Sequence, residues 1–285
     1  MILFKKAEHL QNYLQNERKQ GNSIGFVPTM GALHTGHLSL VDASKLQNEL
    51  TIASIFVNPA QFNDKKDFEK YPVTIEKDMA LLAGAGCDAV FWPPVTEIYP
   101  QGYADSGHYQ LGQLEELLEG KYRPGHFQGV CKVMNRLLDI VQPDHLYMGQ
   151  KDYQQCMVVN RLLDIMQSGA ALHTCPTLRE PDGLAMSSRN VRLNEAERKN
   201  ATAINAALQY IKATIEPGSI TGVIEKSKTV LAEKNFRIDY VAVADAQTLE
   251  PVTRWDGKQQ IVALIAAFQN EVRLIDNMLL NQGKR

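Results

Sequence analysis

FVPTMGALHTGHLSLV, from Phe26 to Val41, joins an apolar run to an amphipathic segment through a glycine-containing turn. His34 and His37 lie three residues apart at the end of this turn. The apolar spacing that follows is typical of a helix, which we expect from His37 to about Asn48. The stretch therefore places two imidazoles where a strand ends and a helix begins.

The start of the expected helix is a candidate anion site. The first turn of a helix presents N–H groups without intrahelical partners and the positive end of the helix dipole, which suits a phosphate chain. Histidine is also the side chain most easily charged near neutral pH. Two other interpretations stay open on this motif alone. The H-x-x-H spacing can form half of a metal site, or His34 can simply cap the helix.

Composition restricts the possible partners and compartment. The chain has 285 residues, a formal net charge of -2 and 44% hydrophobic residues, so it is not built to hold a nucleic acid by bulk positive charge. No apolar run approaches the roughly 20 residues of a membrane span, and the N-terminus lacks the order of a secretory signal. We expect a cytoplasmic protein with reduced, mostly buried cysteines, namely Cys87, Cys131, Cys156 and Cys175.

The order of elements predicts two differently built parts. The first two-thirds of the chain alternates strand and helix patterns, which indicates a parallel α/β sheet with covering helices. The remainder predicts two helices and then strands without helices between them, as in a small α+β domain with a largely antiparallel sheet. The strands expected in the first part are 23–29, 50–59, 87–94, 144–149 and 172–178, and its helices are 37–48, 74–86, 126–142 and 153–167. The second part should hold helices over 194–215 and up to about 234, and strands at 237–249, 260–268 and 272–280.

Polar groups recur where these strands should end. NPAQF supplies the amides of Asn58 and Gln61, and GQKDYQQ supplies Lys151 before a helix that carries Gln155. Ligands bind at the carboxyl ends of strands in open parallel sheets, so these groups are candidates for one site. MSSRN, at residues 186–190, offers two hydroxyls and a guanidinium in the expected interdomain loop, either as a phosphate clamp or as a loop with a helix-capping serine. NPAQF can likewise be a purely structural turn after its strand.

Other polar residues are ambiguous from the sequence. Arg123, in a loop restrained by proline and glycine, is equally suited to hold an anion or to lie on the surface. The remaining isolated histidines are expected to be structural or to make single polar contacts: His108, His126, His145 and His173.

Five motifs together resemble the pantothenate synthetase family of the HxGH nucleotidylyl-transferases. They are PTMGALHTGHLSL, NPAQF, YRPGHFQGV, GQKDYQQ and REPDGLAMSSRN, and they occur in the order and spacing of that family between Phe26 and Leu193. Met148 stands where phenylalanine is common, and Gln150 stands where glutamate is frequent. The resemblance implies a Rossmann-like nucleotide- and pantoate-binding domain over residues 1–180. A smaller α+β domain over 181–285 would act as a lid.

The resemblance also implies a reaction and its participants. An enzyme of this family joins pantoate to β-alanine with ATP through a pantoyl-adenylate, and releases AMP and diphosphate. Mg²⁺ would ride on the ATP phosphates, no tightly bound protein metal is expected, and the protein would be a homodimer. The implied catalytic residues are His34, His37, Lys151 and Arg189. Gln61 and Gln155 would hold pantoate, and Gln61 would also contact β-alanine. ATP would lie against Met30, Gly31, Ala32, Leu33, His34, Thr35, Gly36, His37, Gly149, Gln150, Lys151, Asp152, Leu178, Met186, Ser187, Ser188 and Arg189.

Two rival functions are weighed against this one. A tRNA-charging or other nucleotidyl-transferring enzyme of the superfamily would share the HxGH element, but the sequence pI of about 6.4 argues against a tRNA substrate. A non-catalytic nucleotide-binding module could keep the HxGH element, but it would not need polar groups on five separate loops.

Overall fold

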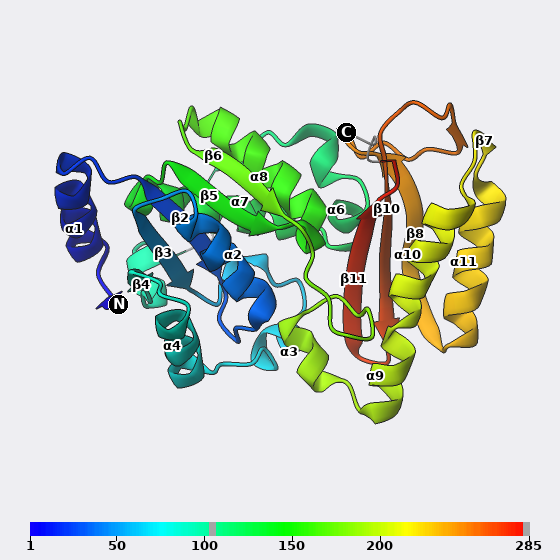
Figure 1. Cartoon of the computed structure of the whole chain (residues 1–285), viewed down its shortest axis with the longest axis horizontal. Coiled ribbons are helices and arrows are strands. Elements are labelled where there is room, and N and C mark those ends of the chain that lie inside the picture. Colours follow the sequence, from blue (N-terminus) through cyan, green and yellow to red (C-terminus); the bar gives the residue numbers. More distant parts are fainter. Residues whose placement is uncertain (103–106, 282–285) are drawn as a thin grey trace.

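The computed structural model describes residues 1–102 and 107–281, and it contains the two differently built parts that the sequence predicts (Figure 1). The first part is a parallel sheet in the order β1-β4-β3-β2-β5-β6. This arrangement confirms the parallel α/β prediction. The strands are β1 (Ile2–Phe4), β2 (Ile24–Thr29), β3 (Leu50–Ile55), β4 (Ala89–Phe91), β5 (His145–Gly149) and β6 (Ala171–Cys175).

Helices cover both faces of the parallel sheet because its central strands are apolar on both sides. On β2, Phe26 belongs to one buried cluster with residues of α1 (Ala7–Lys19), α7 (His126–Val141) and α8 (Tyr153–Met166). The next residue, Val27, belongs to a second cluster with residues of α2 (Thr35–Lys45) and α4 (Ile75–Gly84). Successive side chains of a strand point to opposite faces, so a continuous apolar run can fill two cores.

The second part is smaller and mainly antiparallel, as expected. Its sheet has the order β11-β10-β8, formed by β8 (Phe236–Asp245), β10 (Ile261–Gln269) and β11 (Val272–Leu279). The helix expected over 194–215 is divided into α9 (Glu195–Ala201) and α10 (Ala203–Thr214). At the division, the Thr202 hydroxyl donates to the carbonyl of Lys199 at 2.8 Å, a side-chain bond that competes with the helical pattern. α11 (Thr221–Glu233) and the short strands β7 (Gly218–Ser219) and β9 (Arg254–Trp255) complete this part.

Several short elements were not predicted from the sequence. They include β1 near the N-terminus, together with α3 (Lys65–Glu69), α5 (Val95–Ile98) and α6 (Glu119–Tyr122). The longer helix α1, of 13 residues, was also not predicted. Elements of three to five residues are too short to display a helical or alternating pattern. Within the described ranges, no helix is both long enough and apolar enough to cross a membrane.

The neighbouring strands β2 and β5 separate at their carboxyl ends. β2 pairs with β3 along its whole length, but its pairing with β5 is limited to Gly25 and Phe26. The carbonyl of Ile24 faces β5, where it accepts from the Asp144 N–H, so strand alternation turns the nitrogen of Pro28 toward β5 as well. Proline has no N–H to donate, and the ladder cannot continue past it. A crevice opens here, at the point where the strand order reverses.

Close packing fixes α2 against the sheet beside this crevice. A Cβ atom on Gly25 would lie 2.0 Å from Ser44 Oγ and 2.6 Å from Asn48 Nδ2. Both side chains are held in place, because Ser44 Oγ hydrogen bonds with Thr51 Oγ1 at 2.8 Å and Asn48 Nδ2 donates to the Tyr147 hydroxyl at 2.9 Å. The absence of a side chain at Gly25 therefore allows the helix to approach β2.

We predict that Gly25→Ala lowers the free energy of unfolding by roughly 1–3 kcal/mol, because the added methyl overpacks the contact between β2 and α2. Urea unfolding followed by circular dichroism measures the change. Gly169→Ala is the matched control, because a Cβ there meets no atom within 4 Å. Equal stability of the two variants would contradict the close approach.

Candidate active site

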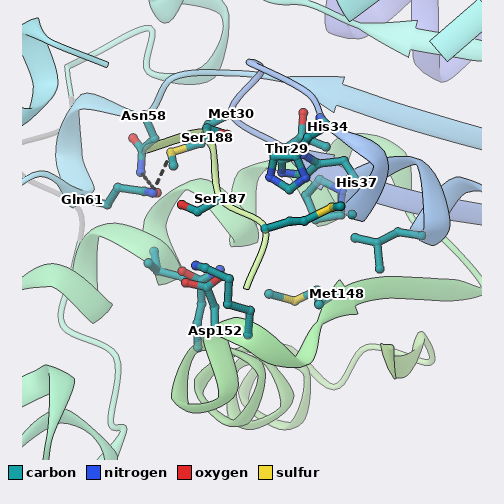
Figure 2. Close-up of a pocket in the computed structure, with 18 of the residues that line it drawn as sticks. Thr29, Met30, His34, His37, Asn58, Gln61, Met148, Asp152, Ser187 and Ser188 are labelled. Carbon is teal, nitrogen blue, oxygen red and sulfur yellow. Dashed lines mark hydrogen bonds and ion pairs between the residues drawn. The ribbon is translucent and has the colours of Figure 1, made fainter. Parts of the chain in front are cut away.

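An open cavity of about 200 Å³, which we call the site cavity, lies at the crevice between β2 and β5. Figure 2 shows His34 and His37 on one side of it and Asn58 and Gln61 on the other, with Met148 and Asp152 below them. Fourteen of the site residues named from the sequence line it: Met30, His34, Gly36, His37, Gln61, Gly149, Lys151, Asp152, Gln155, Leu178, Met186, Ser187, Ser188 and Arg189. Five others do not line it: Gly31, Ala32, Leu33, Thr35 and Gln150.

The two imidazoles lie against each other at the start of α2. The ring centroids of His34 and His37 are 4.0 Å apart, and the backbone N–H of His34 donates to His37 Nδ1 at 3.3 Å. His37 Nδ1 is therefore an acceptor, which leaves the proton of the neutral ring on Nε2. His34 Nδ1 is buried and has no hydrogen-bond partner among the described residues.

Burial keeps both rings neutral in the free protein. Burial, the neighbouring His34 and the charge of Lys151 lower the pKa of His37 to about 3. Burial and the charge of Lys151 lower the pKa of His34 to about 4. Near pH 7 the histidines therefore offer hydrogen bonds without charge, and the cations lining the cavity are Lys151 and Arg189.

The loop that carries Lys151 is fixed by the C-terminal sheet. Lys151 lies in η3 (Gln150–Asp152), and its Nζ is 3.5 Å from Asp152 Oδ2. From β11, Asn277 Nδ2 donates to the carbonyls of Gln150 and Lys151, both at 2.9 Å. The Gln150 side chain donates back to Asn277 Oδ1 at 3.1 Å. Gln150 is thus turned toward β11, which explains why it does not line the cavity.

The turn between β2 and α2 is fixed by a buried carboxylate. Asp78 of α4 accepts the backbone N–H groups of Ala32 at 2.9 Å and Leu33 at 2.8 Å. These two N–H groups are therefore engaged within the protein. Gly31 lines a separate cavity on the other side of the turn, and the Thr35 hydroxyl donates to Met186 Sδ at 2.9 Å. The turn positions His34 and His37, while its own middle residues face away from the site cavity.

The 186–192 segment lies along one side of the cavity. An aspartate outside this segment binds its two arginines. Ser188 Oγ donates to the carbonyl of Ala32 at 2.9 Å. Asp67 of α3 accepts from Arg189 Nη2 at 2.8 Å and Nε at 3.3 Å, and from Arg192 Nη1 at 2.8 Å. Burial opposes the charge on Asp67, but the two arginines lower its pKa overall. Asp67 did not emerge from the sequence, because its partners lie more than 120 residues away.

The amide of Gln61 has a defined orientation. Gln61 lies in η1 (Pro59–Gln61), and Asn58 Nδ2 donates to its Oε1 at 3.0 Å. The Gln61 amino group is therefore left for the cavity, where it contacts Met30 Sδ at 2.9 Å. Asn58 is itself buried, and its Oδ1 accepts from the Tyr99 hydroxyl at 2.8 Å. Tyr99 thus supports Gln61 through Asn58, and no sequence motif indicated it.

The ambiguous residues of the sequence have partners within the protein. Arg123 does not line the site cavity; its Nη1 lies 3.1 Å from His126 Nε2. His145 Nδ1 and His173 Nε2 are 2.9 Å apart, and His108 Nε2 is 3.5 Å from a Glu115 carboxylate oxygen. All four cysteines are free, and three of them are buried, as expected. Among residues 1–102 and 107–281, no three His, Cys, Asp or Glu side chains are grouped to hold a metal ion.

Comparisons with known proteins agree on one family. A family model described as pantoate-beta-alanine ligase matches residues 2–279. Pantothenate synthetase from Moorella thermoacetica is 44% identical over 283 residues, which cover 98% of this chain and 99% of the relative.

Two solved structures extend the likeness to the fold. The crystal structure of pantothenate synthetase from Thermus thermophilus has a TM-score of 0.90 and 40% identity, covering 98% of this chain and 99% of that one. Pantoate-beta-alanine ligase from Francisella tularensis, complexed with beta-gamma ATP and beta-alanine, has a TM-score of 0.83 and 34% identity and covers 99% of both chains.

The neutral histidines make stability depend on pH. Between about pH 6.5 and 4 the unfolded chain binds protons that the folded His34 and His37 do not, so the free energy of unfolding falls as the pH is lowered. We expect each ring to contribute roughly 1–2 kcal/mol of this loss between pH 7 and 5. Urea unfolding at both pH values, with a His34→Gln/His37→Gln double variant as comparison, measures the effect. The interpretation is wrong if the double variant loses as much stability as the parent.

Proposed function

Because this chain belongs to the pantoate-beta-alanine ligase family, we propose that its site cavity condenses pantoate with β-alanine at the expense of ATP. In the first step the pantoate carboxylate attacks the α-phosphate of ATP, diphosphate leaves, and a pantoyl-adenylate forms. In the second step the β-alanine amine attacks the acyl carbon of the adenylate. AMP leaves, the amine loses a proton, and the amide of pantothenate is formed.

One observation carries this proposal: phosphate-binding groups and a preoriented amide face each other across the same cavity. His34 and His37 lie across the cavity from Gln61 in Figure 2, and Lys151, Arg189 and Gln155 line the same cavity. The structure of the Francisella tularensis relative is a complex with beta-gamma ATP and beta-alanine, which supports a common site for both ligands.

We assign the phosphate side by charge and hydrogen-bonding capacity. Negative charge builds on the phosphoryl oxygens and the leaving diphosphate, and preorganised donors stabilise it in a site with little water. Lys151 and Arg189 provide positive charge, while neutral His34 and His37 provide ring N–H groups. Ser187, Ser188 and the backbone near Gly149 would line the remaining nucleotide, and Leu178 would lie beside the adenine. The engaged residues Ala32, Leu33 and Gln150 would support this shape from outside the cavity.

We assign the acid side to the two glutamines. An amide recognises a hydroxyl or carboxylate by direction without adding charge. Asn58 occupies Oε1 of Gln61, so the Gln61 N–H that does not bond Met30 Sδ would donate toward pantoate and then toward the β-alanine carboxylate. Gln155 lines the cavity from α8 and would contact the other end of pantoate.

Several finer assignments stay predictions. We propose that Mg²⁺ arrives on the phosphate oxygens of ATP, because Mg²⁺ prefers such oxygens and water. A homodimer and a cytoplasmic location are expected from the family resemblance. The division into residues 1–180 and 181–285 is supported by β6, which ends at Cys175, and by α9, which begins at Glu195. A closing movement of the second part would keep water from the adenylate.

The reaction itself predicts its nucleotide product. Incubation of the purified chain with ATP, Mg²⁺, pantoate and β-alanine should yield pantothenate and AMP in equal amounts, measured by mass spectrometry. Attack at the γ-phosphate would instead yield ADP. ADP as the stoichiometric product would contradict the proposal.

Lys151 is predicted to stabilise the phosphoryl transfer. Lys151→Ala should slow single-turnover formation of the adenylate by about 10²-fold, the scale for loss of one preorganised stabilising group. Lys19→Ala, which removes an exposed lysine in the last turn of α1, is the matched control. Circular dichroism should show both variants folded. A Lys151→Ala rate close to that of the control would show that the ammonium group does not act on the phosphates.

A further inference from the structure

Arg123 and His126 belong to a buried polar chain that connects the C-terminal sheet with Gln61. It begins on β11, where Arg273 Nη1 and Nη2 donate to the two carboxylate oxygens of Glu119, both at 2.8 Å. Arg273 is itself fixed by Asp239 of β8, whose Oδ2 accepts from Nε at 2.8 Å. The Tyr240 hydroxyl donates to Glu119 Oε1, also at 2.8 Å. The C-terminal sheet therefore fixes the Glu119 carboxylate through two side chains.

The chain continues from Glu119 to the backbone of the cavity. Arg123 Nη1 is 3.6 Å from Glu119 Oε2 and 3.1 Å from His126 Nε2. His126 Nδ1 is 2.8 Å from the backbone carbonyl oxygen of Gln61. A guanidinium can only donate, so His126 Nε2 accepts and Nδ1 carries the proton that is donated to Gln61. Burial and the charge of Arg123 lower the pKa of His126 to about 3, which keeps the ring in this neutral form.

Gln61 rests directly on the turn of α7 that begins with His126. A Cβ atom on Gly129 would lie 2.1 Å from the Ala60 carbonyl oxygen and 2.7 Å from Gln61 Cα. The carbonyl of Gly129 also accepts from Asn58 Nδ2 at 3.1 Å. The backbone of η1 is thus seated on α7 without an intervening side chain. A small displacement of the first turn of α7 would move the Gln61 amide with it.

The backbone next to Glu119 is strained. Leu118 has φ 44° and ψ -114°, a conformation that a non-glycine residue adopts at a cost. Gln154, which is buried, accepts the Glu119 N–H at 3.0 Å and donates to the carbonyls of Leu114 and Leu117 at 2.9 Å. The hydrogen bonds of Gln154 therefore hold Glu119 in place although the backbone conformation of Leu118 is unfavourable. Such strain is typical of residues whose placement matters for function.

We propose that His126 is a positioning residue. Through Arg123 and Glu119, it makes the orientation of the Gln61 amide depend on the position of the C-terminal sheet. The proposal rests on the assignment of Gln61 to the acid substrates. His126 does not touch these substrates; it holds the carbonyl of the residue that does. Its loss should weaken the use of pantoate and β-alanine and leave ATP nearly unaffected, because the chain ends at Gln61.

Two variants of His126 distinguish the roles of the two imidazole nitrogens. His126→Asn places an amide near the position of Nδ1, so it can still donate to the Gln61 carbonyl. His126→Gln places its amide near Nε2 and leaves that carbonyl without its donor. We expect His126→Gln to raise the KM for pantoate about tenfold, the scale for one lost hydrogen bond, with the KM for ATP changed less than twofold. His126→Asn should stay within about threefold of the parent for pantoate.

Arg18→Ala is the matched control at the other end of α7. Arg18 Nη2 donates to the carbonyls of Val141 and Gln142, at 2.6 and 2.8 Å. Its loss should lower stability in urea without changing any KM selectively. His126→Gln would overturn the proposal if it changed all KM values equally, or none of them. Equal pantoate KM values for His126→Gln and His126→Asn would also overturn it.

Arg273→Lys tests the far end of the chain, because lysine keeps the charge and loses the two parallel hydrogen bonds to Glu119. The same selective rise in the pantoate KM is expected, and an unchanged KM would overturn the link to β11. If this variant does not fold, Tyr240→Phe replaces it, since it removes a single hydrogen bond to Glu119.

Gln61→Ala distinguishes failure of this proposal from failure of the proposed function. If Gln61→Ala raises the pantoate KM and His126→Gln does not, only the positioning role is wrong. If Gln61→Ala leaves the pantoate KM unchanged, the assignment of the acid side and the positioning role are both wrong. If the parent forms no pantothenate, the proposed function itself is wrong.

Discussion

The missing N–H of Pro28 is the constraint on which the site depends. A proline inside a central strand removes a ladder hydrogen bond, and such a position is usually avoided. Here the loss falls on the side of β5, after the two strands have already paired at Gly25 and Phe26. The strands stay joined at their amino ends, where the core is buried, and part at their carboxyl ends. The histidines follow one strand and Lys151 follows the other, so the separation leaves room for a ligand between them.

The C-terminal sheet completes the site through polar contacts of β11. Arg273 binds Glu119, Asp276 accepts two hydrogen bonds from Arg179 at 2.6 and 3.0 Å, and Asn277 holds the loop of Lys151. Burying charged groups is costly, and such pairs contribute less to stability than their geometry suggests. These pairs instead fix the orientation of the segments that they join, because a hydrogen-bonded arginine and carboxylate allow only one relative geometry. One strand thereby contacts both the loop of Lys151 and the buried polar chain that ends at Gln61.

The parts of this structure that could be predicted from sequence are those with local signals. Apolar periodicity identified the helices α2, α4, α7 and α8, and polar residues at strand ends indicated part of the cavity lining. Further lining residues, such as Met30, Leu178 and Met186, were indicated by the family resemblance. The supporting residues could not be found in this way. Asp67, Asp78 and Asn277 lie on elements that carry no motif, and each acts on a segment distant in sequence.

Adjacency within a motif also does not reveal orientation. Gln150 stands between two residues that line the cavity, yet its side chain is turned to Asn277, 127 residues away. The charge state of the histidines also could not be predicted from the sequence. It depends on burial and on Lys151, which reaches the same space from another strand.

Asp67 has a consequence for which anions the cavity can retain. Arg189 is already bonded to Asp67, which accepts two of its hydrogen bonds and also pairs with Arg192, and Lys151 lies beside Asp152. A chloride or a single carboxylate would have to take the place of the Asp67 or Asp152 carboxylate, and it would gain little binding free energy by doing so. A chain of several phosphates can share the guanidinium while bonding to its other neighbours, and it brings more charge than it displaces. The cavity is therefore expected to discriminate among anions by valence, with abundant monovalent anions as poor competitors.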